Sequence, residues 1–183
     1  MQIRKRKTDE NGRSMVEMLG VLAIIGVLSI GGIAGYSKAM AKYKLNKAQD
    51  QIFMIITNIR TYYAGKGSYG GLDNQEAIKL SIAPSDMLPN ADKTSANGIR
   101  SAFGGKVNIK AVDDNVGQFS IEFQDIGTET CISLMSSDWG TDGLVSIATG
   151  ALTAGAGELP VAPSTAAANC KGGGNNNIVW TFY

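Results

Sequence analysis

The stretch that decides the fold is MLGVLAIIGVLSIGGIAGYS, residues 18–37. It carries no charged side chain, and as a helix its length would be about 30 Å, the thickness of a bilayer's hydrocarbon core. A cleaved secretory signal has a shorter apolar core followed by small residues, a pattern that Ala34-Gly35-Tyr36 imitates. The length therefore favours a membrane-spanning helix, and an ordinary signal peptide is the alternative.

Basic residues flank the apolar run at both ends, so charge alone barely favours a cytoplasmic N-terminus. They are Arg4, Lys5, Arg6, Lys7 and Arg13 before it, and Lys38, Lys42, Lys44 and Lys47 after it. The two cysteines, Cys131 and Cys170, indicate the orientation of the chain in the membrane more clearly than charge does. An even pair in a chain that looks exported predicts one disulfide, which places the C-terminal part outside the cytoplasm. The alternative is two buried free thiols in a cytosolic protein.

Glu17 lies directly before the apolar run, where an unpaired carboxylate at the bilayer edge is costly. A local explanation exists, because Ser14-Met15-Val16-Glu17 fits a capping box with Ser14 as the N-cap. The residues around Glu17 suggest a second explanation.

The segment GRSMVEMLGVLAIIGVL, residues 12–28, resembles the prepilin signature of type IV pilins and related pseudopilins. The resemblance implies that a membrane aspartyl peptidase cuts between Gly12 and Arg13 and that the new N-terminus at Arg13 is methylated. It also implies that Glu17 pairs with the α-amine of a neighbouring Arg13 during subunit assembly, since opposite charges attract strongly in a low dielectric. Arg13 departs from the pattern, because family members usually have an apolar or aromatic residue there.

Glycines replace the proline that kinks many pilin helices. The pair Gly31-Gly32 is the predicted point of helix flexibility. Close helix packing in the membrane is an equally good explanation for these small residues.

The resemblance extends to the rest of the chain. Residues 63–72, 84–87 and 119–123, with Cys131 after them, resemble type IVb pilins. Apolar residues after the membrane run recur at helical spacing and predict that the helix continues with one stripe under a sheet. They are Leu45, Ala48, Ile52, Ile55, Ile56, Ile59 and Tyr62.

Alternating apolar and polar residues predict a hairpin from 106–111 and 119–124, and a last strand at 178–183. Short helices are expected near 74–80 and, with Thr128 as its N-terminal cap, up to about Trp139. The stretch 140–177 is rich in Gly, Ala, Thr and Asn, and we expect it to be exposed loop tethered by the disulfide.

The predicted fold class is α+β, the type IV pilin fold. A long N-terminal helix, with a membrane half and an amphipathic half, packs on a small antiparallel sheet that has a disulfide-bounded C-terminal loop region. The predicted parts are a cleaved leader (1–12), a hydrophobic transmembrane and assembly helix (13–37), its amphipathic continuation (38–64) and a globular head (65–183), which includes the disulfide-bounded region 131–170.

The resemblance implies a structural subunit of a type IV pilus that polymerises through its N-terminal helix after leader cleavage. Adhesion, motility or DNA and conjugative contact are the implied roles, and a pseudopilin of a type II secretion or competence machine is the alternative. Implied partners are other copies of the chain, minor pilins, the prepilin peptidase and methyltransferase, and an inner-membrane assembly platform with its ATPase. The precursor is expected in the inner membrane and the mature subunit in an extracellular fibre.

Composition argues against other functional classes. The chain has no histidine, the commonest general base and metal ligand. Its two cysteines alone make a poor metal site, and Asp113-Asp114-Asn115 lacks the spacing of a calcium loop. A net charge of +1 gives no basic field for nucleic acid. We therefore expect no enzyme activity, cofactor, metal or direct nucleic-acid site.

Overall fold

The computed structural model describes residues 10–88, 98–140 and 143–183, except for the side chains of residues 10–14. It divides into two compact units, residues 1–42 and 43–183. Helix α1 (Glu10–Tyr63) begins in the first unit and ends in the second. In the first unit, every described side chain from Met15 to Ala39 is exposed.

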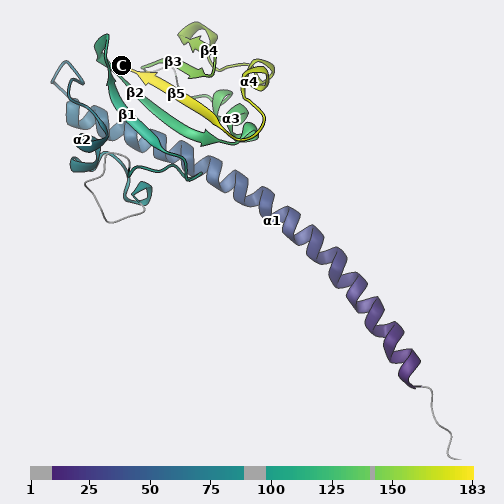
Figure 1. Cartoon of the computed structure of the whole chain (residues 1–183). Coiled ribbons are helices and arrows are strands. Elements are labelled where there is room, and N and C mark those ends of the chain that lie inside the picture. The colour runs from purple at the N-terminus through teal and green to yellow at the C-terminus, as the bar shows by residue number, and fades with distance from the viewer. Residues whose placement is uncertain (1–9, 89–97, 141–142) are drawn as a thin grey trace, which may run out of the picture. The chain divides into compact units, whose positions relative to one another are not determined.

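The second unit, residues 43–183, is built on one antiparallel sheet. Its described strands are β1 (Val107–Val112), β2 (Asn115–Ile126), β3 (Leu144–Thr149), β4 (Leu152–Gly155) and β5 (Asn176–Phe182). Their order is β1-β2-β5-β3-β4, so the last strand of the chain lies in the middle of the sheet (Figure 1). The predicted last strand is confirmed, with bounds Asn176–Phe182 in place of 178–183.

The predicted hairpin is also confirmed. Strand β1 pairs with β2, with Val107 opposite Phe123, Ile109 opposite Ile121 and Ala111 opposite Phe119. These apolar residues share one face because side chains alternate along a strand. Strand β2 begins at Asn115, earlier than the alternation alone suggested, and continues to Ile126.

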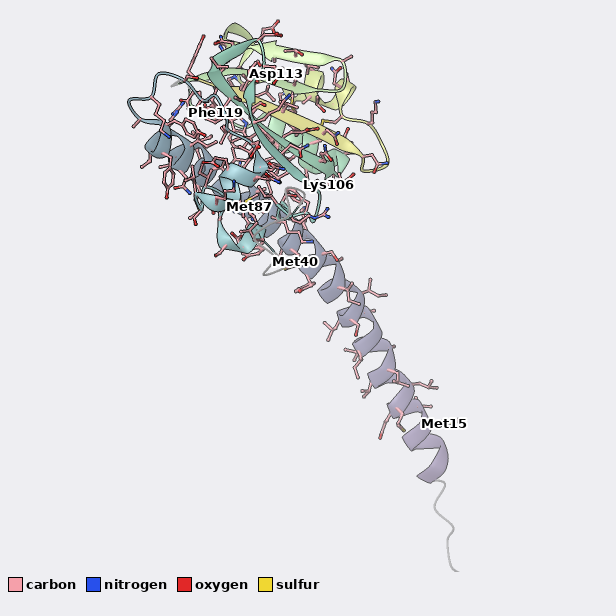
Figure 2. The ribbon with its side chains drawn as sticks, turned by 60° about the vertical axis from the view of Figure 1, so that its left-hand side comes forward. Met15, Met40, Met87, Lys106, Asp113 and Phe119 are labelled. Carbon is pink, nitrogen blue, oxygen red and sulfur yellow. A yellow bond between two sulfur atoms is a disulfide. The ribbon has the colours of Figure 1, made fainter. Side chains whose placement is uncertain are left out.

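The last turns of α1 supply the core with the predicted apolar stripe. Ala48, Ile52, Ile55 and Ile59 are fully buried in the same cluster as residues of the sheet. Met87 and Phe119, labelled in Figure 2, belong to this cluster and are also fully buried. At the end of the stripe the prediction was wrong by one residue: Tyr63 is 8% exposed and buried, whereas Tyr62 is 45% exposed.

Three short helices complete the described head: α2 (Asn74–Lys79), α3 (Thr128–Met135) and α4 (Pro163–Asn169). Single 3-10 turns lie at Ser85–Met87 and Ala156–Glu158. Helix α2 begins where predicted, because Asp73 caps it by accepting a hydrogen bond from the Glu76 amide at 2.7 Å.

Helix α3 differs from its prediction at both ends. Its N-cap is Gly127, and the Thr128 hydroxyl instead donates to the Lys171 carbonyl at 2.6 Å. The helix ends at Met135, four residues before the predicted Trp139. Trp139 folds back so that its indole N–H donates to the Leu134 carbonyl at 2.9 Å, which satisfies an acceptor at the helix end.

The expectation of an exposed loop over residues 140–177 was wrong. This stretch contains β3, β4 and α4. Leu144, Ile147, Ala154, Val161 and Ala166 are buried. The alternation that predicts strands is hard to recognise here, because alanine and glycine are frequent and contrast little in hydrophobicity with polar residues.

Candidate functional site

The first candidate site is the apolar segment of α1, residues 15–36. It carries thirteen large apolar side chains that are each 52–73% exposed. They are Met15, Val16, Met18, Leu19, Val21, Leu22, Ile24, Ile25, Val27, Leu28, Ile30, Ile33 and Tyr36. Figure 2 shows side chains on this part of the helix, near the label of Met15.

This segment is apolar around the whole helix. A helix that covers the core of a soluble protein has one apolar stripe, whereas a helix apolar on all sides belongs inside a large core or a membrane. In the described part of the chain, α1 is the one helix whose length and composition would let it cross a membrane, and none of its apolar window is buried. Within the described part of its own unit, residues 10–42, nothing covers this surface.

Gly31 and Gly32 lie within the same segment. A Cβ atom added at either position would meet no atom within 4 Å. Neither glycine is therefore needed to avoid a clash in a single copy. Flexibility and packing against another helix both remain as explanations.

The predicted cleavage and assembly residues lie at the start of α1. The helix begins at Glu10, so Gly12, Arg13 and Ser14 have helical backbone. An N-cap residue has non-helical backbone, so Ser14 is not the cap and the local explanation for Glu17 does not hold here. Glu17 is exposed.

The second candidate site is the disulfide-bounded region. Cys131 of α3 is bonded to Cys170, the C-cap of α4, with their Cα atoms 5.9 Å apart. Neither cysteine is free. The prediction of a disulfide-bounded C-terminal region is confirmed, and the alternative of two free thiols is wrong.

Asn176 fixes the loop that follows Cys170. Its amide nitrogen donates to the carbonyls of Ile126 at 3.0 Å and Lys171 at 3.1 Å, and its amide oxygen accepts from the Lys171 N–H at 2.6 Å. The residue is only 4% exposed, and its bond to Ile126 is fully buried. Sequence reasoning missed this residue, because it is the middle one of three consecutive asparagines and nothing in the sequence distinguishes it from its neighbours.

A polar cluster holds α1 to the loops beside it in the head. Gln51 is 3% exposed and donates to Asp86 Oδ2 at 2.9 Å, while its oxygen accepts from the Ala102 N–H at 3.0 Å. Lys47 Nζ lies 3.0 Å from the same carboxylate oxygen. Sequence reasoning missed this cluster as well.

The cluster changes the pKa of both ionisable groups. The hydrogen bond and charge of Asp86 raise the pKa of Lys47 above its ordinary value. Partial burial raises the pKa of Asp86, but hydrogen bonds from Lys47 and Gln51 and the lysine charge outweigh it and lower the pKa overall. Both shifts favour the charged pair.

Comparison with known proteins gives consistent matches. Residues 42–183 match the family model described as PilS N terminal. The major structural subunit of the bundle-forming pilus of Escherichia coli O127:H6 is 26% identical over 136 residues, which cover 74% of this chain and 68% of that protein. The toxin coregulated pilin of Vibrio cholerae is 26% identical over 137 residues, which cover 72% of this chain and 59% of that protein.

Among solved structures, a type IV b pilin from Salmonella typhi aligns with a TM-score of 0.54 at 19% identity. The alignment covers 76% of this chain and 97% of that one. At this identity the likeness shows the fold, which agrees with the predicted long helix, small antiparallel sheet and C-terminal disulfide.

Proposed function

This chain belongs to the PilS N-terminal family, and on that premise we propose that it is a type IVb pilin precursor and the structural subunit of a type IV pilus. Its relatives support this, since they are a major pilus subunit and a pilin rather than enzymes. The observation that carries the proposal is the uncovered apolar segment of α1, residues 15–36.

That segment needs an apolar environment that one copy does not provide. Burying a large aliphatic side chain is worth about 1.5–3 kcal/mol. Thirteen such side chains left in water would be far more costly than the stability of an ordinary domain, about 5–15 kcal/mol. We infer that residues 13–37 lie in the membrane in the precursor and pack against the same segment of other copies in the fibre.

Processing precedes assembly in this proposal. The leader, residues 1–12, is removed between Gly12 and Arg13, and the new α-amine of Arg13 is methylated by the prepilin peptidase and methyltransferase. Proteases bind extended chain, so the first turn of α1 must unwind for the cut. Gly12 makes this easier, because glycine is about 1 kcal/mol less favourable in a helix than alanine.

Glu17 then selects the register between copies. Its carboxylate lies one helical turn beyond Arg13 and pairs with the α-amine of Arg13 in an adjacent copy. Moving either charge into an apolar fibre core unpaired is costly, so only the register that brings them together is stable. The side chain of Arg13 adds a second positive charge to this contact.

The rest of the chain, residues 38–183, also has a place in the proposed pilin. Residues 38–64 continue the helix, and residues 65–183 form the exported head, whose disulfide suits an oxidising compartment. The precursor resides in the inner membrane, where an assembly platform with its ATPase adds it, with minor pilins, to the extracellular fibre. The fibre serves adhesion, motility or DNA and conjugative contact.

The test is Glu17→Gln in cells that make the fibre. We expect membrane insertion and leader cleavage to persist, while the number of pili seen by electron microscopy falls at least about tenfold, because an unpaired buried charge costs several kcal/mol. Asp50→Asn is the matched control, since Asp50 is an exposed carboxylate on the same helix. Wild-type piliation with Glu17→Gln, or equal losses in both variants, would contradict the proposal.

A further inference from the structure

A polar hollow lies beside the disulfide, on the face of the sheet opposite the buried core. Its volume is about 340 Å³, at the lower end of the range for small-molecule sites, about 300–1,000 Å³. Ala148 of β3 and Val179 of β5 lie opposite each other in the sheet, and both line the hollow. Their strand neighbours Ile147 and Ile178 belong to the core, so the hollow lies on the other face.

Segments that are cross-linked to the rest of the head bound this hollow. Asn169 ends α4, and Lys171 and Asn175 belong to the loop that leads to β5. Between them lies Cys170, whose disulfide ties the segment to α3. Gly150, in the turn between β3 and β4, lines the hollow too, and a Cβ added there would lie 3.8 Å from the Asn169 carbonyl oxygen. The hollow is therefore held in shape before any ligand arrives.

Lys171 combines a fixed backbone with an unpaired side chain. Its N–H donates to Asn176 Oδ1 at 2.6 Å, and its carbonyl accepts from the Thr128 hydroxyl at 2.6 Å and from Asn176 Nδ2 at 3.1 Å. Lys171 itself is exposed, and its ammonium forms no salt bridge within the described part of the chain. None of the described residues that line the hollow is acidic. One positive charge is thus held at this place and would attract an anion.

The other polar side chains of the hollow include three asparagine amides, which suit hydroxyl groups. Asn175 and Asn177 are exposed, and neither side chain is bonded to another described residue. Asn169 donates its Nδ2 to the Thr165 carbonyl at 2.9 Å, which leaves its Oδ1 as an acceptor. Because an asparagine amide both donates and accepts, a well-matched ligand supplies hydrogen-bond donors as well as an anionic group. Acetate or bare phosphate offers mainly acceptors, whereas a sugar hydroxyl offers both.

We propose that this hollow binds an acidic sugar, that is, a pyranose ring that carries a carboxylate. The Lys171 ammonium pairs with the carboxylate, and the three asparagine amides exchange hydrogen bonds with the ring hydroxyls. The side chains of Ala148 and Val179 contact the C–H groups of the ring. Charged hydrogen bonds are roughly twice as strong as neutral ones, so Lys171 contributes most to the affinity. This proposal is independent of the proposed pilus function, because all of these residues belong to the head.

The test is a titration of the full chain with D-glucuronate, D-glucose and acetate, in a detergent that has neither a sugar nor an anionic headgroup. Glucose lacks the carboxylate, and acetate lacks the hydroxyls. Amide signals in ¹H–¹⁵N NMR spectra report where each compound binds. We expect glucuronate to shift the signals of Lys171, Asn175 and Asn177 with a Kd of about 1–10 mM. Glucose and acetate should each bind at least about tenfold more weakly.

Two substitutions test the individual groups. Lys171→Gln removes the charge and should weaken glucuronate binding about tenfold, without changing the response to glucose. Asn177→Ala removes one amide and should weaken glucuronate binding about threefold, and it decides the question if Lys171→Gln alters the loop. The matched control is Lys106→Gln, which should change nothing. Lys106, labelled in Figure 2, is an exposed lysine that does not line the hollow.

Weaker glucuronate binding in Lys171→Gln and Asn177→Ala, with Lys106→Gln unchanged, would support the site. Acetate binding as tight as that of glucuronate, or equal effects of Lys171→Gln and Lys106→Gln, would overturn it, because a surface lysine then attracts anions without a sugar site. A spectrum that glucuronate leaves unchanged around Lys171 would overturn it as well.

Discussion

The two ends of α1 have the same backbone conformation and opposite surroundings. Between residues 15 and 36 the large apolar side chains are all more than half exposed, whereas Ile52, Ile55 and Ile59 are fully buried. The first part is apolar on every side, and the second has one apolar stripe with polar residues between. Helix formation therefore does not decide what covers a helix; the distribution of apolar residues around it does.

The difference predicts which changes act on a single copy and which act on assembly. The second unit, residues 43–183, consists of the head (65–183) and the end of α1 that packs on it, and its core is closed by its own sheet and disulfide. Changes in the head should alter its own unfolding. Changes in the uncovered segment should leave head unfolding unaltered and affect only insertion or fibre formation.

Removal of the disulfide should have the largest effect. The double change Cys131→Ser and Cys170→Ser opens a cross-link between residues 39 positions apart. We expect the free energy of unfolding of the head to fall by about 4 kcal/mol, measured by urea denaturation with tryptophan fluorescence. Membrane insertion, measured by protease protection, should not change. An unaltered denaturation midpoint would show that the bond does not stabilise the head.

Matched truncations of two isoleucines compare the two parts of α1 directly. Ile52→Ala removes a fully buried side chain and should cost about 2–5 kcal/mol of head stability. Ile24→Ala removes one that is 63% exposed and should change head stability by less than about 0.5 kcal/mol. Urea denaturation of both variants measures the difference. Equal losses would mean that the head and the uncovered segment share one core.

Substitution of Gly31 and Gly32 tests whether the uncovered segment needs flexibility or close packing at this point. Gly31→Ala with Gly32→Ala should favour the helix by about 2 kcal/mol, because each glycine is about 1 kcal/mol worse than alanine. If the two glycines provide the predicted helix flexibility, the number of fibres seen by electron microscopy should fall severalfold. The control is Gly20→Ala with Gly26→Ala, two changes at equally open positions. Full piliation of the Gly31/Gly32 variant would favour the packing explanation, because alanine is still small enough for close contact.

The smallest effect concerns pH and the Lys47–Asp86 pair. The pKa of Asp86 is lower in the folded state than its ordinary value, so its contribution to stability is present above pH about 4 and is lost as pH falls through the folded pKa. Both side chains are more than a third exposed, so the effect is small. Asp86→Asn should lower the Tm by about 1–3 °C at pH 7 and by less near pH 3. A Tm difference that grows on acidification would contradict this sign.

Much of the fold was predictable because its signals are periodic. The apolar run, the helical stripe from Ala48 to Ile59 and the alternation in β1, β2 and β5 all follow from side-chain spacing. Strands β3 and β4 were not predictable in this way. The buried residues of β3, Leu144, Ile147 and Thr149, do not alternate regularly, and β4 buries only the small side chain of Ala154.

The polar contacts of the head were not predictable, because they join residues distant in sequence. Gln51 binds the Ala102 N–H, Asn74 binds the Ile109 N–H, and Asn176 binds the Ile126 carbonyl. Each partner is a backbone group, which every residue possesses, so the sequence does not mark it. Only the tertiary fold selects it.

The most direct test of the central claim is mass spectrometry of the subunit in purified surface fibres. If the uncovered helix of this chain is the assembly segment of a processed pilin, the subunit begins at Arg13, carries a methyl group on its α-amine and lacks residues 1–12. Fibres whose subunit still carries Met1 to Gly12, or preparations in which the intact chain never enters a fibre, would contradict it.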